Sequence, residues 1–240
     1  SQIAYAGKDG LWILENINFP IGFAKGPRQI TDGNLAPSTS LGASWQFSPD
    51  GRELLLKTSG GLFLLEAGKF TPQGQRINIS SKEKATLETW NKEKETKILA
   101  QTRNLPSELQ DLLQRKANLI VFSPDETKIL YTASASANLG MNLVKPIPGA
   151  STQKEDRDIK IDHTYVYDIK EDRNFLIDPS DNWDKRKLFW LPNSGNLVLG
   201  EEGRITIMDY DGTNRQVVFS GGYTPPYVFP YLNGEKLLIL

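Results

Sequence analysis

Few residues in this chain could carry out chemistry. The sequence contains one histidine, His163, and no cysteine. A Ser-His-Asp or Cys-His arrangement needs a base beside its nucleophile, and no G-x-S-x-G motif is present to expose a serine at a sharp turn. A single histidine also cannot build the usual multi-histidine metal site. We therefore predict no catalytic residue, no metal site and no cofactor.

The acidic residues offer two further possibilities. Asp50 and Asp125 could act as paired catalytic carboxylates, but each occupies the same place in a copy of one repeat, which favours a role in turns. The segment M-D-Y-D-G-T-N, from Met208 to Asn214, resembles a calcium loop but lacks the later glutamate of an EF-hand. Asp-Gly is common in hairpin turns, so we interpret this segment as one.

The repeat that contains these acids is the main structural signal. It consists of an aromatic residue, a short polar turn and a run of Leu, Ile and Val. Clear copies begin at Phe47 (F-S-P-D-G-R-E-L-L-L), Phe122 (F-S-P-D-E-T-K-I-L-Y) and Trp190 (W-L-P-N-S-G-N-L-V-L), and weaker copies begin at Trp90 and Phe229. Proline fixes φ at the first turn position, and Asp or Asn bonds back to the turn backbone. Each copy therefore predicts a β-hairpin, and the predicted turn residues are Pro49, Asp50, Pro124, Asp125, Pro192 and Asn193, with Asp211 and Gly212 in a later hairpin.

Further strands follow these hairpins. We expect third strands at 62–66, 165–169 and 205–209, and fourth strands at 76–79, 175–177 and 216–219; the opening segment 3–14 has its own strand, Asp-Gly turn and strand. The copies start 32 residues apart (90 to 122) to 68 residues apart (122 to 190), which brackets the length of a propeller blade. The sequence thus predicts an all-β fold: a β-propeller of about five or six blades, complete or incomplete, forming a single domain over residues 1–240.

One short helix interrupts this pattern near 107–116. In L-P-S-E-L-Q-D-L-L-Q-R-K, Ser107 and Gln110 have capping-box spacing. Three leucines form one apolar stripe: Leu109, Leu112 and Leu113. Such stripes usually face a core, so we expect the helix to pack on the side of the sheets, with docking of a partner as the alternative.

The F-S-P-D-G turn with its apolar strand, together with I-x-x-M-D-Y-D-G-T-N, is similar to the repeat of TolB-type propellers. The run from Ser123 and the segment Y-V-Y-D-I-K-E-D-R-N-F from Tyr165 look like propellers that follow PEGA modules in bacterial envelope proteins. That resemblance implies an extracytoplasmic, membrane-tethered protein, although the absence of cysteine also fits a reducing cytoplasm. Related propellers precede hydrolase domains of the prolyl oligopeptidase type, so the repeat indicates architecture rather than activity.

Binding residues are expected in two long connections. Residues 133–162 form a connection far longer than an ordinary hairpin loop, and Arg157 and His163 are its candidates. The second surface is aromatic, and its candidates are Trp183, Arg186, Tyr223 and Tyr227. For both surfaces the alternative is structural: a passive insertion for the first, and packing between blades for the second.

Charge and chain ends limit the possible partners. The sequence has 28 Lys plus Arg against 29 Asp plus Glu, without a dense basic segment, so nucleic acid is not an expected partner. No apolar run is long enough to enter a membrane. Because the chain starts at Ser1 and stops within the apolar run 236–240, we expect a fragment whose tether lies elsewhere.

These observations predict a non-catalytic binding or scaffold propeller that presents loops to a protein or a cell-wall polymer. Two alternatives stay open: a propeller that gates or docks a hydrolase encoded outside this segment, and an enzyme with carboxylates around a central channel.

Overall fold

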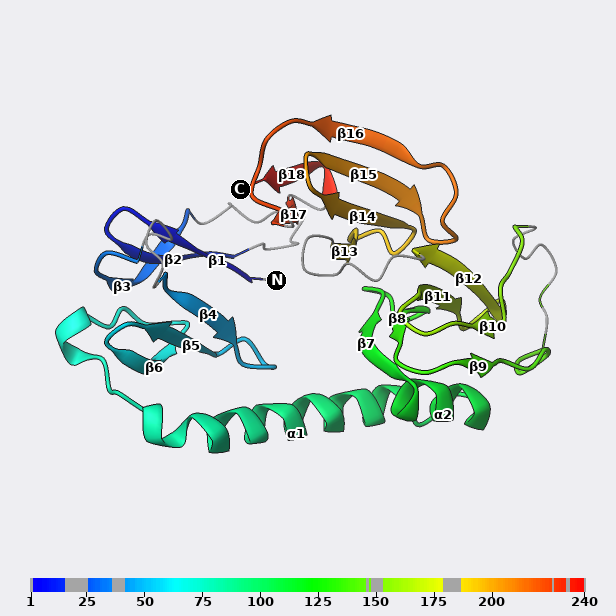
Figure 1. Ribbon diagram of the computed structural model, residues 1–240, viewed down its shortest axis with the longest axis horizontal. Helices are drawn as coiled ribbons and strands as arrows, with labels where there is room; N and C mark the ends of the chain where they lie inside the picture. Colours follow the sequence, from blue (N-terminus) through cyan, green and yellow to red (C-terminus); the bar gives the residue numbers. More distant parts are fainter. Residues whose placement is uncertain are drawn as a thin grey trace. The chain divides into compact units, whose positions relative to one another are not determined.

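The computed structural model (Figure 1) describes residues 2–15, 26–35, 42–145, 147, 153–178, 187–225, 227–231 and 234–239. Most of its elements are strands in antiparallel sheets, joined by two α-helices, so the all-β prediction is confirmed. The chain forms two compact units, Ser1–Ala100 and Gln101–Leu240, which we call the first and the second unit. The single-domain assignment stays a prediction.

The first unit contains two three-stranded sheets (Figure 1). One has the order β1 (Gln2–Gly7), β2 (Gly10–Glu15), β3 (Arg28–Asp32), and the other β4 (Ser44–Phe47), β5 (Glu53–Thr58), β6 (Gly61–Glu66). Their facing apolar side chains form one core, which includes Leu11, Ile13, Ile30, Leu54, Leu56 and Leu65. Two short 3-10 turns, Gln73–Gln75 and Ser80–Lys82, lead into the long helix α1 (Glu83–Thr102).

The second unit begins with α2 (Ser107–Arg115) and a four-stranded sheet of order β12-β11-β8-β7, which we call sheet C. Its strands are β7 (Ala117–Phe122), β8 (Lys128–Ala133), β11 (Thr164–Asp168) and β12 (Arg173–Asp178), and a small pair, β9 (Ala137–Asn138) with β10 (Asp158–Ile159), lies between β8 and β11 in the chain. The next four-stranded sheet, sheet E, runs β13 (Lys187–Trp190), β14 (Asn196–Glu201), β15 (Arg204–Asp209), β16 (Gln216–Ser220). The hairpin of β17 (Val228–Tyr231) and β18 (Lys236–Ile239) follows.

Successive sheets of the second unit pack face to face. Leu130, Val166 and Phe175 of sheet C share a buried cluster with Trp190 and Leu197 of sheet E. The opposite face of sheet E packs its Val198 and Ile205 against the β17–β18 hairpin. Sheet E is therefore covered on both faces, which explains why three successive residues of β14, Leu197 to Leu199, are apolar.

The repeat turns form as the sequence predicts, and they share one hydrogen-bond pattern. Ser48 Oγ donates to Asp50 Oδ1 over 2.7 Å, and Ser123 Oγ donates to Asp125 Oδ1 over the same distance. Each carboxylate also accepts a backbone N–H two residues further on. In the third copy the side chain of Asn193 accepts the N–H of Gly195 over 3.0 Å. Four of the five predicted hairpins, those at Phe47, Phe122, Trp190 and Phe229, are confirmed.

The fourth turn position carries a strain that one substitution can relieve. It has positive φ in all three turns: Gly51 at 73°, Glu126 at 57° and Ser194 at 58°. Only glycine adopts this conformation without a steric cost. We expect Glu126→Gly to raise the free energy of unfolding by about 0.5–1 kcal/mol, measured by urea denaturation. Gly51→Ala is the matched control and should be destabilising; a loss of stability in Glu126→Gly would contradict this explanation.

Trp90 does not begin a hairpin, and this prediction is wrong. The residue lies in α1, buried against Leu55 and Leu62 of the first unit. The residues after Trp90 are Asn-Lys-Glu instead of Ser-Pro-Asp, so no turn former follows, and the surrounding Glu, Lys, Ala and Leu favour a helix. The expected strand at 76–79 also does not form, since its pairing is one isolated bridge between Phe63 and Asn78.

Helix α2 is confirmed, and its three leucines face the core of sheet C. The predicted capping box is wrong. Pro106 occupies the N-cap position with no side-chain cap, and Ser107 is already helical. Gln110 instead turns back to donate to the carbonyl oxygen of Leu105 over 2.7 Å.

Candidate functional site

The hairpin turns of sheets C and E fix the orientation of the two sheets. The turn after β7 contacts the turn after β13, because the N–H of Asp125 donates to Ser194 Oγ over 3.0 Å. Near the same end, Trp190 Nε1 donates to the carbonyl oxygen of Val121 over 3.1 Å. The first strands of both sheets therefore end together. Since turns of a meander alternate between its two ends, the connections β8 to β11, β14 to β15 and β16 to β17 leave from the opposite end. We call this opposite end the loop end.

The loop end brings together three of the four binding candidates that the structure describes. His163 lies at the end of the β8–β11 connection, and Tyr223 and Tyr227 lie in the β16–β17 connection. Arg157 also belongs to the β8–β11 connection, but it bonds to Asp172 in the β11–β12 turn and therefore lies at the opposite end of sheet C. The Tyr223 hydroxyl donates to the carbonyl oxygen of Glu201 in the β14–β15 hairpin, which joins two of these connections. Trp183 and Arg186 lie outside the described residues.

The β8–β11 connection is more ordered than a plain loop. We call its described arms, residues 134–145 and 153–163, the strap. The arms pair as β9 and β10, and the N–H of Leu139 donates to the carbonyl oxygen of Arg157 over 2.9 Å. Leu139 and Ile159 are buried against the tyrosines of sheet C and the leucines of α2. The many charges of segment 153–160 would predict a solvated loop, but its Ile159 is fully buried.

Arg157 holds the strap to the sheet. Its Nε lies 2.8 Å from Glu155 Oε2, and one terminal nitrogen lies 3.3 Å from Asp172 Oδ1. The terminal nitrogens also donate to the carbonyl oxygens of Gly140 and Asp172. Burial opposes the charge, but the two carboxylates outweigh it and raise the pKa of Arg157 above its ordinary value. All these partners belong to the chain itself, so the contacts position the strap.

Three tyrosines of sheet C lie fully buried beneath the strap: Tyr131, Tyr165 and Tyr167. The rings of Tyr131 and Tyr165 stack with their centroids 5.5 Å apart. Tyr131 donates to Asn174 Oδ1 over 2.9 Å, and Tyr167 donates to Asp172 Oδ1 over 2.7 Å. Burial raises the pKa of all three hydroxyls, because a phenolate would lose its hydration there.

These raised pKa values predict a loss of stability at alkaline pH. A tyrosine that is neutral in the folded state but ionised in the unfolded state stabilises the fold fully below the unfolded pKa of about 10. That contribution is lost as the pH rises from the pKa of the unfolded state toward the pKa of the folded state. We expect the free energy of unfolding to fall above pH of about 10 by about 1.4 kcal/mol per pH unit for each of Tyr131 and Tyr167.

Tyrosinate absorbance against pH measures this effect, with urea-unfolded protein as the reference. The folded protein should show a delayed fraction that ionises only as the fold is lost. Complete ionisation with the fold intact would contradict the burial of these hydroxyls.

The remaining candidates at the loop end are more accessible. His163 Nδ1 lies 3.0 Å from the carbonyl oxygen of Ile161, and its ring stacks toward Tyr165 with centroids 6.5 Å apart. Tyr223 packs edge-on against Phe219, whereas Tyr227 is 50% exposed. Large apolar side chains are exposed on the strap too, namely Met141 at 70% and Ile161 at 52%. Exposure of apolar side chains, which the sequence pattern did not indicate, is therefore a second property of the strap, and Ile161 brings it to the loop end.

The carboxylates of the repeat have the structural role predicted for them. The N–H of Arg52 and the Ser48 hydroxyl lower the pKa of Asp50. Burial raises the pKa of Asp125, but hydrogen bonds from Ser123 and Thr127 outweigh it and hold that pKa well below its usual range. Asp211 accepts from the N–H and hydroxyl of Thr213, as a turn residue would. Among the described residues, no group of three or more His, Cys, Asp or Glu side chains could hold a metal ion.

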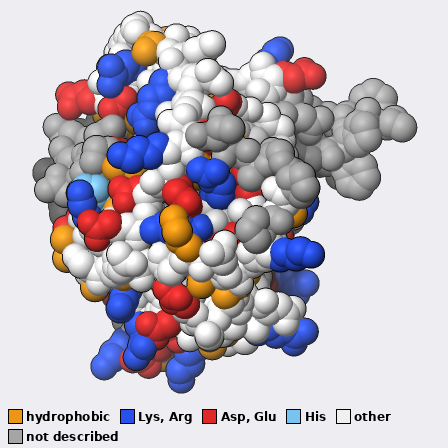
Figure 2. Space-filling model, turned by 90° about the vertical axis from the view of Figure 1, so that its right-hand side faces the viewer, with side chains coloured by type: hydrophobic (Ala, Val, Ile, Leu, Met, Phe, Trp, Pro, Cys, Tyr) orange, Lys and Arg blue, Asp and Glu red, His pale blue; other side chains and the backbone are white. Residues whose placement is uncertain are grey.

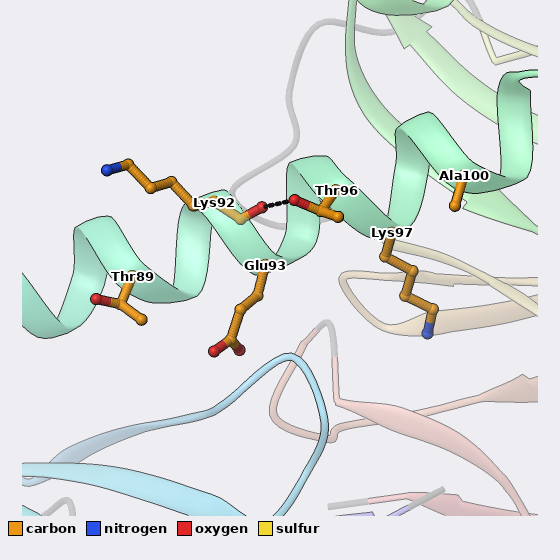
Figure 3. Close-up of a pocket in the computed structure, with 6 residues that line it drawn as sticks. All are labelled: Thr89, Lys92, Glu93, Thr96, Lys97 and Ala100. Carbon is orange, nitrogen blue, oxygen red and sulfur yellow. Dashed lines mark hydrogen bonds between the residues drawn. The ribbon is translucent and has the colours of Figure 1, made fainter.

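A hollow on the first unit is a weaker candidate (Figure 3). It is lined by Thr89, Lys92, Glu93, Thr96, Lys97 and Ala100, all of which belong to α1. Thr96 Oγ1 donates to the carbonyl oxygen of Lys92 over 2.8 Å, so its hydroxyl serves the helix. Side chains from a single helix do not converge on a ligand, and the hollow contains none of the predicted residues.

Comparison with known proteins adds little to this description. No family model matches the sequence, and no curated protein matches it. Among solved structures, one described as a crystal structure of the eukaryotic initiation factor matches 99% of this chain and 44% of its own, at 11% identity and a TM-score of 0.31. Kuenenia stuttgartiensis hydrazine synthase matches 88% of this chain and 49% of its own, at 13% identity and a TM-score of 0.21. This chain spans less than half of either, and the likeness supports no argument about function.

Proposed function

We propose that this chain is a non-catalytic β-propeller that binds a protein or a cell-wall polymer through the loop end of its second unit. The observation that carries the proposal is the gathering of His163, Tyr223 and Tyr227 at one end of two packed sheets. Connections held by a rigid scaffold are the usual place for binding residues. Exposed Tyr227 and Ile161 supply apolar contact area there.

The propeller architecture is supported by the repeat itself. Sheets C and E are both four-stranded meanders, and each contributes one face to a shared core, as blades of a propeller do. A common turn pattern begins the second strand of each hairpin. About five or six such blades, as the sequence predicts, would give the scaffold its rigidity. An experimental structure whose sheets do not share one axis would contradict this architecture.

The surface charge fits a partner other than nucleic acid. On the face drawn in Figure 2, Lys and Arg side chains are interspersed with Asp and Glu. Binding to DNA or RNA relies on a continuous basic surface. No described helix is long and apolar enough to cross a membrane. We place the protein outside the cytoplasm, tethered by a segment beyond this chain, on the strength of its resemblance to envelope propellers; fractionation of cells that carry the full-length protein tests this.

A binding experiment with paired surface variants tests the proposed function. Purified peptidoglycan sacculi, and separately a cross-linking experiment on intact cells, are the probes. We expect binding or cross-linking to be lost in the double variant Tyr227→Ala, Ile161→Ser and to be kept in the control Val217→Ser. Val217 is 54% exposed but lies on β16, outside the loop-end connections. Equal binding by both variants would reject the loop end as the site.

The same experiment separates the alternative function. If neither probe binds but a hydrolase domain encoded beside this segment co-purifies with it, the propeller serves that hydrolase instead.

A further inference from the structure

The strap is attached to sheet C mainly by polar contacts. Of its described residues, Leu139 and Ile159 alone are fully buried apolar side chains. By contrast, every residue of β11 beneath it is buried, as are all but the first residue of β8. Burial of apolar surface is the main stabilising contribution in folding. The strap therefore buries much less apolar surface than sheet C, which it covers.

The polar contacts are concentrated at a few points. Arg157 bonds to Glu155, Asp172 and Gly140, as described above. Asp156 pairs with Asn174, since its N–H donates to the Asn174 carbonyl over 2.8 Å and its carbonyl accepts from Asn174 Nδ2 over 2.6 Å. Glu108, in the first turn of α2, accepts the N–H of Gly140. Charge-assisted bonds such as those of Arg157 are the strongest of these.

The surface under the strap is suited to bind an extended chain. The Tyr165 hydroxyl accepts the N–H of Lys160 over 2.9 Å, so a tyrosine of the sheet bonds to strap backbone. Asn174 does the same with Asp156. If the strap left, the Tyr165 hydroxyl and the polar groups of Asn174 that now bond to its backbone could bond to another extended peptide, while the leucines of α2 would still pack against the tyrosine rings.

We propose that the strap is a locally opening cover, latched by Arg157, over a tyrosine surface that accepts an extended peptide segment in its place. The peptide part of this inference rests on the proposed function, because it assigns a segment of the partner protein to the second unit. The opening does not, since it is a property of the free protein. Segments with few buried apolar contacts open at lower free energy than the core around them.

Hydrogen exchange followed by mass spectrometry on the whole chain tests the opening. The amides of Asp156 and Asp162 can report it, because they donate to the carbonyl oxygens of Asn174 and Ala133 in sheet C, and so can that of Lys160, which donates to the Tyr165 hydroxyl. We expect them to exchange at least about 100-fold faster than the amides of the β8–β11 ladder, because local opening costs less than global unfolding. Equal rates for strap and ladder would overturn the proposal, as only global unfolding would then expose the strap.

Variants of the latch sharpen the test. Arg157→Gln should speed exchange of the strap amides by about tenfold to a hundredfold, the factor expected from the loss of charge-assisted bonds, without a change in the ladder. Glu155→Gln is a milder variant that removes a partner lying away from the sheet, and we expect a few-fold increase. Arg204→Gln is the matched control, because Arg204 pairs with Glu201 outside the strap. Equal acceleration of strap and ladder amides in both latch variants would overturn the latch.

Nitration of tyrosine by tetranitromethane tests whether opening uncovers the surface. The nitration rates of Tyr131 and Tyr165 should rise in Arg157→Gln by about the same factor as the exchange rates of the strap amides. Unchanged nitration rates would show that opening of the strap does not expose these tyrosines. Unlabelled peptides from a random extended library, added during exchange, test the occupant: slower nitration supports a peptide site. If the strap opens but no peptide protects the tyrosines, the assignment of a peptide ligand is wrong, whereas the opening of the strap is still supported. The proposed function is tested independently by the binding of peptidoglycan sacculi.

Discussion

Replacing Phe175 with alanine is expected to lower the free energy of unfolding of the second unit by about 3–5 kcal/mol. The ring is fully buried and lies in the cluster that joins sheet C to sheet E. Tyr210 packs edge-on against it, with ring centroids 5.9 Å apart. Truncation removes this burial and leaves a cavity between two sheets whose backbones are fixed by their own ladders, so little collapse can compensate.

Urea denaturation followed by circular dichroism measures this loss, and hydrogen exchange of the β11–β12 amides assigns it to the second unit. Val217→Ala, on the exposed side of β16, is the matched control and should change stability by less than about 0.5 kcal/mol. A loss below about 1 kcal/mol in Phe175→Ala would show that the two sheets do not depend on this contact.

Gly10→Ala is expected to destabilise the first unit by about 3 kcal/mol. Gly10 begins β2 with φ of +156°, and a Cβ placed on it would lie 2.0 Å from the carbonyl oxygen of Thr31. That atom belongs to the backbone of the neighbouring strand β3 and cannot swing aside as a side chain could. The sheet must therefore shift at the β1–β2 turn, or lose the pairing of Gly10 with Asp32.

Gly68→Ala is the control for this substitution, since nothing lies within 4 Å of the position its Cβ would take. It should leave stability within about 0.5 kcal/mol of the parent protein. Thermal and urea denaturation of both variants give the comparison. Similar stabilities for the two variants would mean that the β2–β3 pairing tolerates displacement, contrary to the close approach at Thr31.

Two sources of stability act in this protein. One is local, in which turn residues such as Asp50 and Asp125 bond to their own backbone. The other is the packing of one sheet on the next, in which residues far apart in the chain meet, as Trp190 and Val121 do. The binding surface that we propose depends on the second, because only packed sheets hold separate connections at one end.

The elements that sequence reasoning located correctly are those specified by short-range chemistry. The turn after Phe122 depends only on three adjacent residues, Ser123, Pro124 and Asp125. The apolar run that follows them forms the expected strand. The sequence pattern wrongly predicts a hairpin over residues 90–99, which are helical, because an aromatic residue before an Ile-Leu run resembles the repeat. The missing turn former after Trp90, and the helix-favouring Glu and Lys, were the signals against it.

For the candidate site, the sequence indicated which connections were long, but not what they contact. It could not reveal that Arg157 bonds to Asp172, 15 residues away, or that three tyrosines lie beneath the strap. Such pairings depend on how strands β8, β11 and β12 are aligned, and alignment is a property of the sheet rather than of any segment.

The amino-acid sequence by itself determined the all-β class, the hairpin turns and the helix at Ser107–Arg115, because backbone preferences and apolar periodicity act over a few residues. The tertiary structure alone decided which sheet faces pack together, which charged residues are held by partners within the chain, and which connections share one end. These features arise from contacts between distant segments, and they form only when apolar faces that no single hairpin can bury are covered by a neighbouring sheet.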